Sequence, residues 1–118
     1  MKTEKHTFVI CAYQESDFLE ECIESLKRQT VKSKIIMVTS TPNHHITQLA
    51  EKYQIPLFIN EGPGGITQDW NFGYQCAKTE YVTIAHQDDV YRKDYLERAV
   101  RAVENFKKPL IFFSDYYE

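Results

Sequence analysis

Two adjacent carboxylates, Asp88 and Asp89, follow an apolar, strand-like run that covers residues 81–85, with only His86 and Gln87 between. Adjacent anionic side chains repel each other, and a bound cation removes that repulsion. A hard divalent ion held by one or two carboxylates together with substrate phosphates is the usual arrangement for magnesium. The pair therefore indicates a metal and phosphate site or, because Asp is frequent in turns and caps, a simple cap for the next helix.

Three further segments carry candidate ligands, and each of them also follows a predicted strand. They are Ala12 to Glu15, Ser40 with Thr41, and the Gly-rich loop from Asn60 to Gly65. That loop lacks the Lys and Ser/Thr of a P-loop and the glycine spacing of a dinucleotide-binding fingerprint. Its glycines favour a tight backbone turn before a helix over a phosphate cradle.

The elements that must position these residues alternate along the chain. Runs of β-forming residues predict strands, and apolar residues at helical spacing predict helices between them. The predicted strands cover residues 7–11, 34–39, 57–59, 81–85 and 110–113. The predicted helices begin near Asp17, near Thr41 and Pro42, at Ile66 and near Lys93, with Asp17 and Thr41 as the expected N-caps of the first two. The third predicted helix ends at Ala77, with Trp70 and Tyr74 buried. Such alternation predicts an α/β fold with a mainly parallel sheet and helices on both faces.

The order of the strands decides which candidate segments meet. In an open parallel sheet, ligands bind beyond the carboxyl ends of the strands, where the strand order reverses. With the first strand central we expect the order 3-2-1-4, which puts the crevice between the first and fourth strands. Glu15 and Asp88 are then expected around one cavity.

Composition restricts the class of protein. A chain of 118 residues, 42% of them hydrophobic, is enough for one compact domain, so we expect residues 1–118 to form a single domain. A net charge of −3 with interspersed signs excludes the basic footprint of a nucleic-acid-binding protein. No apolar run approaches the roughly 18 residues that a membrane span needs. Three cysteines without zinc-site spacing indicate reduced core residues in a cytoplasmic protein.

Two long segments resemble family 2 glycosyltransferases, which have the GT-A fold. Residues 7–30, TFVICAYQESDFLEECIESLKRQT, resemble the opening of that family, where a Tyr-Asn-Glu-like turn precedes a helix reading L-x-x-C-I-x-S-L-x-x-Q-T. Residues 62–91 are similar to its Gly-rich loop, the helix that follows and its Asp-x-Asp metal motif, whose place His86-Gln87-Asp88-Asp89 takes. The matching positions elsewhere are Leu19, Cys22, Ile23, Ser25, Leu26, Gln29, Thr30, Gly64, Asn71, Gly73, Ala77 and Tyr81.

The resemblance implies a GT-A, Rossmann-like domain that binds a nucleoside diphosphate-sugar. Asp88 would ligate Mg²⁺ or Mn²⁺ bridging the diphosphate, with Asp89 and His86 as further candidate ligands, and the ion would polarise the leaving group. Tyr13 and Glu15 would line the nucleoside pocket. The full set of implied donor-binding residues is Ala12, Tyr13, Glu15, Ser40, Gly64, Asn71, His86, Gln87 and Asp88.

Four positions depart from the family's pattern. His86 stands for the first Asp of the metal motif; imidazole suits Mn²⁺ better than Mg²⁺, and a hydrogen bond to ribose or phosphate is its alternative role. Thr39-Ser40-Thr41 replaces an Asp pair, which leaves the nucleotide's identity open. Trp70 stands where Arg is common, and Thr79 stands where Gly is common.

The family's catalytic base, a carboxylate that deprotonates the acceptor, belongs to a later segment that this sequence does not match. We therefore expect no catalytic residue in this chain. We expect the chain to be the donor-binding half of a longer catalytic domain, which binds the sugar nucleotide but transfers sugar poorly. A glycan or lipid-linked acceptor is implied, in a cytoplasmic protein for which peripheral membrane association stays open. The alternatives are a non-catalytic nucleotide-binding or regulatory module with a degenerate metal site, and a related nucleotidyltransferase.

Overall fold

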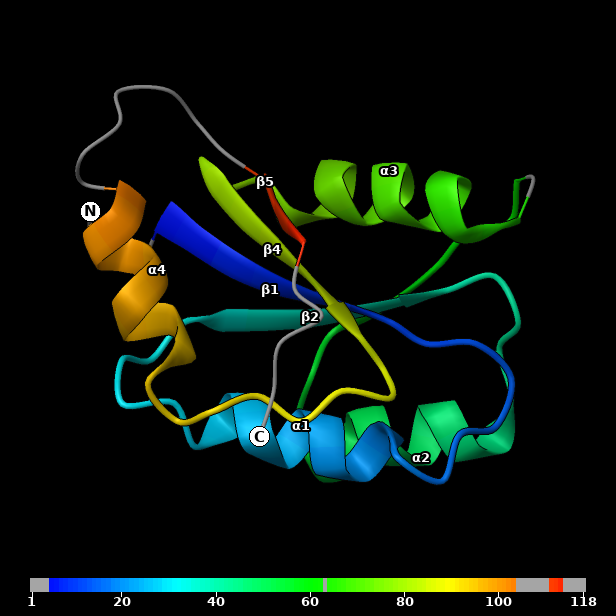
Figure 1. The fold of residues 1–118 in the computed structure, drawn as a ribbon. Coiled ribbons are helices and arrows are strands. Elements are labelled where there is room, and N and C mark those ends of the chain that lie inside the picture. Colours follow the sequence, from blue (N-terminus) through cyan, green and yellow to red (C-terminus); the bar gives the residue numbers. More distant parts are fainter. Residues whose placement is uncertain (1–4, 63, 104–110, 114–118) are drawn as a thin grey trace.

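The computed structural model of the protein describes residues 5–62, 64–103 and 111–113, in which five parallel strands form one sheet. The strands are β1 (His6–Cys11), β2 (Lys34–Thr39), β3 (Leu57–Ile59), β4 (Tyr81–His86) and β5 (Ile111–Phe113). The helices are α1 (Leu19–Lys27), α2 (His44–Lys52), α3 (Ile66–Ala77) and α4 (Tyr95–Val103). Figure 1 shows how they are arranged.

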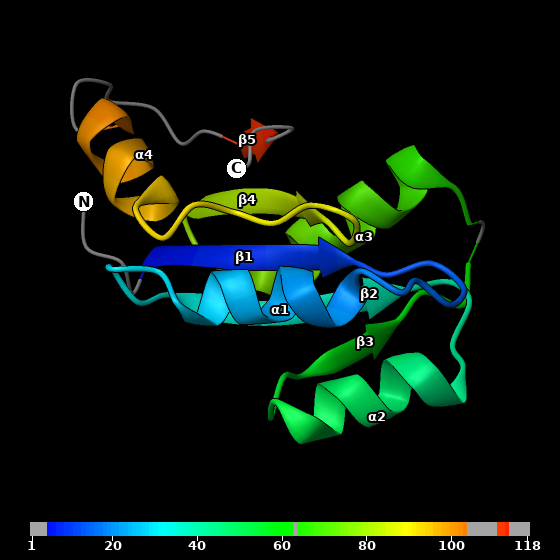
Figure 2. The same ribbon diagram turned by 60° about the horizontal axis from the view of Figure 1, so that its bottom comes forward.

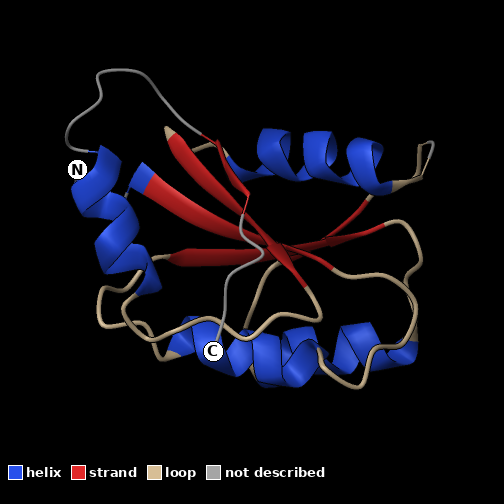
Figure 3. Ribbon diagram, viewed as in Figure 1, coloured by secondary structure: helices blue, strands red, loops and turns tan. Residues whose placement is uncertain are grey.

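This architecture confirms the predicted α/β fold. The strand order is β3-β2-β1-β4-β5, so the predicted order 3-2-1-4 is correct, and β5 is added beside β4. Helix α3 lies on one face of the sheet, and α1 and α2 lie on the other (Figure 3). Figure 2 shows the arrowheads of β1 to β4 pointing the same way, toward the loops that lead into α1 and α3. The chain therefore gathers these loops at one end of the sheet.

Neighbouring side chains of the central strand β1 enter two separate apolar clusters. Phe8 and Ile10 pack with residues of α1, α2 and α4, whereas Val9 packs with residues of α3. Side chains alternate between the faces of a strand, so a strand covered on both faces reads as a continuous apolar run. Gly73 brings α3 close to this strand, because a Cβ there would lie 2.5 Å from Val9 Cγ1.

The start of α2 differs from the predicted one. The helix begins at His44, and its N-cap is Asn43, whose side chain accepts a hydrogen bond from the backbone nitrogen of Ile46 at 2.9 Å. Thr41 was the predicted cap, but its hydroxyl oxygen accepts a hydrogen bond from the backbone nitrogen of Gln14 at 2.6 Å instead. A contact between two loops thus decides where this helix starts.

Three other predicted features are wrong or displaced. Helix α1 begins after Phe18 without any side-chain cap, so Asp17 does not cap it. Tyr74 was predicted to be buried, yet 44% of its surface is exposed. Helix α4 begins at Tyr95, two residues after the predicted start. Residues 104–106 of the predicted fourth helix and Leu110 of the predicted fifth strand lie outside the described residues.

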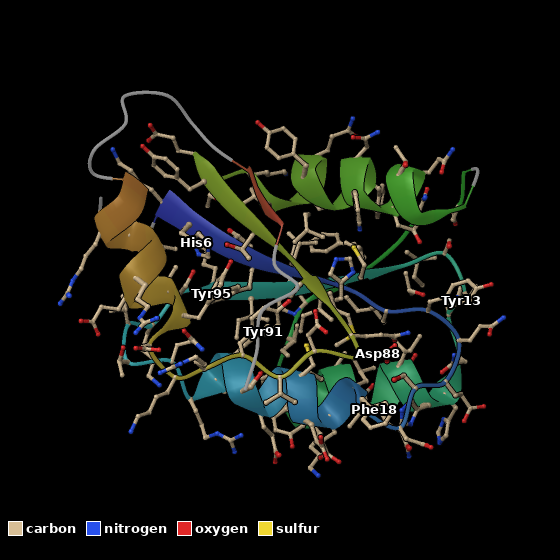
Figure 4. The ribbon with its side chains drawn as sticks, viewed as in Figure 1. His6, Tyr13, Phe18, Asp88, Tyr91 and Tyr95 are labelled. Carbon is tan, nitrogen blue, oxygen red and sulfur yellow. The ribbon has the colours of Figure 1, made fainter. Side chains whose placement is uncertain are left out.

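His6 is fully buried at the start of β1 (Figure 4). Its Nδ1 lies 2.7 Å from Ser33 Oγ, and its Nε2 lies 2.7 Å from Thr83 Oγ1. Ser33 Oγ donates its own proton to the backbone oxygen of His6, so it accepts from Nδ1, and Nε2 then accepts from Thr83. The contacts therefore fit a neutral ring, and burial lowers the pKa of His6 from 6.5 to about 4.

The free energy of unfolding should therefore depend on His6 in mildly acidic solution. The unfolded chain binds a proton near pH 6.5 and the folded chain only near pH 4, so the stabilisation is complete above pH 6.5 and is lost as pH falls toward 4. The shift corresponds to about 3 kcal/mol. In urea unfolding at about pH 4.5 and about pH 7, His6→Gln should remove roughly 2 kcal/mol of the wild-type difference between the two conditions.

The exposed His44 provides the matched control, and His44→Gln should leave that pH difference at its wild-type size. An unchanged pH difference in His6→Gln would contradict the assignment of a neutral buried ring. Lower stability of His6→Gln at neutral pH alone would not, since the variant also loses two hydrogen bonds.

Candidate functional site

A cavity of about 440 Å³ lies beyond the carboxyl ends of β1 and β4. The segments that follow these two strands form part of its wall, and the start of α3 forms the rest. The lining residues are Cys11, Ala12, Tyr13, Gly65, Asp69, Trp70, His86, Gln87 and Asp88. This is the place that the predicted strand order assigned to a ligand crevice. Tyr13 and Asp88 mark the two loops in Figure 4.

The cavity brings together part of the predicted donor-binding set. Ala12, Tyr13, His86, Gln87 and Asp88 line it. The predicted donor-binding residues that do not line it are Glu15, Ser40, Gly64 and Asn71, and the candidate metal ligand Asp89 does not line it either. Gly65 belongs to the predicted Gly-rich segment, and the lining residues outside every predicted strand-end segment are Cys11, Asp69 and Trp70.

Glu15 points away from the cavity. It is exposed and lines a second, open hollow with Gln14, Thr41, Pro42 and Asn43. Gln14 has a left-handed backbone conformation, with φ of 53°, which turns the chain between the two hollows. The expectation that Glu15 and Asp88 lie around one cavity is thus wrong for Glu15, although its neighbour Ser16 reaches Asp88.

Ser40 contacts the lining residue Asp69, and Gly64 packs against Ser40. Ser40 Oγ donates a hydrogen bond to Asp69 Oδ2 at 3.1 Å, and a Cβ at Gly64 would lie only 2.9 Å from Ser40 Oγ. Both residues therefore pack close to a lining residue without lining the cavity. Asn71 is exposed on α3.

The side chain of Gln87 joins the two loops of the site. Its Oε1 accepts a hydrogen bond from the backbone nitrogen of Tyr13, and its Nε2 donates one to the backbone oxygen of Tyr13, both at 3.0 Å. These two hydrogen bonds join the chain segments just beyond Cys11 and His86, the last paired residues of β1 and β4. Gln87 therefore fixes the spacing between the ends of β1 and β4.

Asp88 is exposed at the cavity, and one of its oxygens is held by the loop before α1. Ser16 Oγ donates a hydrogen bond to Asp88 Oδ1 at 2.7 Å and accepts one from the backbone nitrogen of Phe18 at 3.1 Å. Burial raises the pKa of the nearby Cys22 thiol, and the negative charges of Asp89 and Asp88 raise it further. The carboxylate is thus oriented and stays accessible.

Helix α1 and Gln29, two residues beyond its end, hold the segment that follows Asp88. Ser25 Oγ accepts a hydrogen bond from the backbone nitrogen of Tyr91 at 3.0 Å. Gln29 is buried, and its side chain accepts from the backbone nitrogen of Leu96 at 2.8 Å and donates to the backbone oxygen of Arg92 at 2.6 Å. These contacts give the backbone of the segment hydrogen-bond partners from a distant part of the chain.

Two further side chains form the opposite wall of the cavity. The rings of Trp70 and His86 meet edge to face, with centroids 5.7 Å apart. Asp69 lies in the first turn of α3 and is buried. Burial, and after it the charge of Asp69, raises the pKa of Cys11 to about 12, so this lining thiol is protonated at neutral pH. The predicted strand ends gave no signal for these helix residues.

The side chains that could ligate a metal ion restrict the kind of metal site that fits here. Within the described residues, no group of three His, Cys, Asp or Glu side chains is placed to hold a metal ion. Asp88 offers an accessible carboxylate, and His86 lines the same cavity. Such a set fits an ion that takes its other ligands from substrate phosphates and water, and it does not fit a cage of protein ligands alone.

The fold and the cavity define a Rossmann-like α/β domain with a ligand crevice at the switch in strand order. The family model described as Glycosyl transferase family 2 matches residues 7–115. The chain therefore belongs to glycosyl transferase family 2, and the resemblance of its two long segments is confirmed.

Curated relatives agree with this membership. The chain is 26% identical over 115 residues to glycosyltransferase GlyG of Streptococcus pneumoniae serotype 4, covering 92% of this chain and 38% of that protein. It is 24% identical over 119 residues to glycosyltransferase GlyA of the same organism, covering 97% of this chain and 17% of GlyA. It is 28% identical over 104 residues to glycosyltransferase EpsJ of Bacillus subtilis, covering 83% of this chain and 30% of EpsJ. The chain thus spans less than two fifths of the length of these relatives.

None of the helices in the described part of the chain combines the length and the apolar character that crossing a bilayer requires.

The hydrogen bonds of Gln29 provide a test of how the loop after β4 is held. Gln29→Met keeps a long side chain but removes the partner of the Leu96 nitrogen and one of the two donors to the Arg92 oxygen, which also accepts from the backbone nitrogen of Tyr95. The free energy of unfolding should fall by about 1–3 kcal/mol, the cost of one buried group left unpaired. Urea unfolding measures the loss, and Gln48→Met, on the exposed side of α2, should change stability by less than about 0.5 kcal/mol. Equal effects of the two substitutions would contradict the role given to Gln29.

Proposed function

We propose that this chain is the donor-binding part of a glycosyltransferase. On this proposal, the cavity beyond β1 and β4 holds a nucleoside diphosphate-sugar together with Mn²⁺ or Mg²⁺. One observation carries it: the residue in the place of the family's metal motif, Asp88, lines a cavity at the switch in strand order. The family membership supports glycosyl transfer as the reaction class.

The charges of the cavity support metal-dependent binding. Among the described lining residues there are two carboxylates, Asp69 and Asp88, and no Lys or Arg. A diphosphate placed there without a cation would meet only like charges in a partly enclosed site, where screening by water is weak. A divalent ion between Asp88 and the diphosphate reverses that repulsion. When bound, it would also favour departure of the nucleoside diphosphate from the sugar.

Each side chain has a part in holding the donor. Asp88 would take the ion, with Ser16 fixing one oxygen and leaving the other for it. Gln87 would keep the two loops at constant spacing, because both of its polar atoms pair with the backbone of Tyr13. His86, packed against Trp70, would offer a ring nitrogen to the ion or to a phosphate oxygen. The acceptor, a glycan or a lipid-linked sugar, and its catalytic base would come from outside this chain.

Nucleotide binding is the first test. In a thermal melt with Mn²⁺, at least one member of a panel of UDP, GDP, dTDP and their sugars should raise the melting temperature, and EDTA should reduce the shift. A ligand at ten times its Kd stabilises the folded chain by about 1.4 kcal/mol, or roughly 4 °C for a domain of this size. No shift with any member at millimolar concentration would overturn the proposal.

Asp88 is the second test. Asp88→Asn keeps the acceptor for Ser16 but removes the charge, so the affinity for nucleotide in Mn²⁺ should fall about tenfold or more by calorimetry. His86→Asn should weaken binding less, because it removes the ring but leaves the anionic charge of Asp88 in the site.

Asp17→Asn removes the same charge from an exposed position in the loop before α1 and should leave the affinity unchanged. Full retention of Mn²⁺-dependent binding in Asp88→Asn would refute the metal site. Nucleotide binding that is equal in Mn²⁺ and in EDTA would favour a non-catalytic nucleotide-binding module instead.

A further inference from the structure

Asp69 is a buried carboxylate that lines the cavity, and only 6% of its surface is exposed. Its Oδ2 accepts a hydrogen bond from Ser40 Oγ, and its Oδ1 accepts one from Asn60 Nδ2, both at 3.1 Å. Both partners are neutral. Among the described residues, no Lys or Arg forms an ion pair with Asp69.

A buried carboxylate in this state keeps a large capacity to accept hydrogen bonds. Each carboxylate has about four lone-pair positions, and the two neutral donors use one on each oxygen. Burying such a charge without a cation is costly, and hydrogen bonds from a ligand reduce that cost. The two donors come from the segments after β2 and β3, so they fix the carboxylate at the start of α3.

Asp69 and Asp88 lie on different sides of the sheet's edge. Asp69 lies in the first turn of α3, which covers one face of the sheet (Figure 3). Asp88 is held by Ser16, in the loop that leads into α1 on the other face. The two carboxylates therefore reach the cavity from opposite faces of the sheet.

The part of the sugar nucleotide that faces Asp69 must be able to donate hydrogen bonds and must carry no negative charge. The diphosphate is excluded from that wall by repulsion and is drawn by the ion to Asp88. Hydroxyl groups meet the requirement, because a carboxylate accepts strong, charge-assisted hydrogen bonds from them. Trp70, the next residue, adds an apolar ring to the same wall.

We propose that Asp69 is a specificity-determining residue, whose carboxylate accepts hydrogen bonds from hydroxyl groups of the donor sugar. This inference rests on the proposed function, because it needs a sugar nucleotide in the cavity. Ser40 and Asn60 act through Asp69 and position its carboxylate. The ribose of the nucleotide is the other source of hydroxyl groups, and the experiment separates the two.

The test compares nucleotides with and without their sugar. Calorimetry in Mn²⁺ gives the ratio of the Kd of UDP to that of UDP-glucose or UDP-N-acetylglucosamine, and likewise of GDP to GDP-mannose. Asp69→Asn is nearly isosteric and can keep both neighbours, because its amide oxygen accepts from Asn60 and the Ser40 hydroxyl can turn to accept from its amide nitrogen. We expect this variant to lower the ratio at least about tenfold for the preferred sugar, the cost of a lost hydrogen bond to a charged group. Affinity for the nucleotide alone should stay within about twofold, well inside the factor of ten that 1.4 kcal/mol represents.

Asp17→Asn is the matched control, because it makes the same change at an exposed carboxylate that does not line the cavity. It should keep the sugar ratio within about twofold of wild type, well inside the factor of ten that 1.4 kcal/mol represents. Three results overturn the inference: an unchanged ratio in Asp69→Asn, equal losses for nucleotide and sugar nucleotide, or a wild-type ratio near one for every sugar. The second of these would assign Asp69 to the ribose or to a purely structural role. Absence of all nucleotide binding in wild type is a different outcome, which overturns the proposed function and this inference with it.

Discussion

The loop after β4 keeps its conformation because Ser25 of α1 and Gln29, two residues past the end of this helix, form hydrogen bonds with the backbone of the loop. Residues 87–94 form no helix or strand, yet part of this segment is buried, so its backbone groups need partners. Ser25 pairs with Tyr91, and Gln29 pairs with Arg92 and Leu96. Asp88 lies at the start of this segment, where the hydrogen bonds between Gln87 and Tyr13 hold it close to the end of β1. Much of the geometry of the site thus depends on α1, which lines no part of the cavity.

This dependence gives physical content to the family resemblance in α1. Cys22, Ser25 and Gln29 match the family's opening segment, and each contacts the end of β4 or the chain that follows it through a hydrogen bond. The match there therefore concerns how the loop is held. Two of the four departures from the pattern, His86 and Trp70, line the cavity, and their rings meet edge to face.

The sequence predicted the centre of the sheet well because β1 and β4 are buried along nearly their whole length and read as continuous apolar runs. Strands β2 and β3 and helix α3 have the predicted bounds, and β1 and β4 are each one residue longer than predicted. The start of α2 was missed because the Thr41 hydroxyl pairs with a loop distant in sequence. The position of Ala12, Tyr13 and residues 86–88 directly after predicted strands correctly placed them at the cavity. Asp69 was missed because the closeness of α3 to the sheet depends on Gly73 against Val9, which strand and helix periodicity does not encode.

The charge of the cavity has a thermodynamic consequence for the proposed donor site. Two carboxylates and no Lys or Arg line it within the described residues, so on the proposed function the nucleotide and the ion would each raise the affinity for the other. Linkage would make this coupling reciprocal: the factor by which Mn²⁺ raises nucleotide affinity would be the factor by which nucleotide raises Mn²⁺ affinity. The position of Asp69 would then fix the orientation of the bound donor. The diphosphate and the ion would lie toward Asp88 and the α1 side, and the uncharged sugar would face Asp69 on the α3 side. An acidic wall that would repel a nucleotide without metal would thus help to orient the donor once the ion is bound.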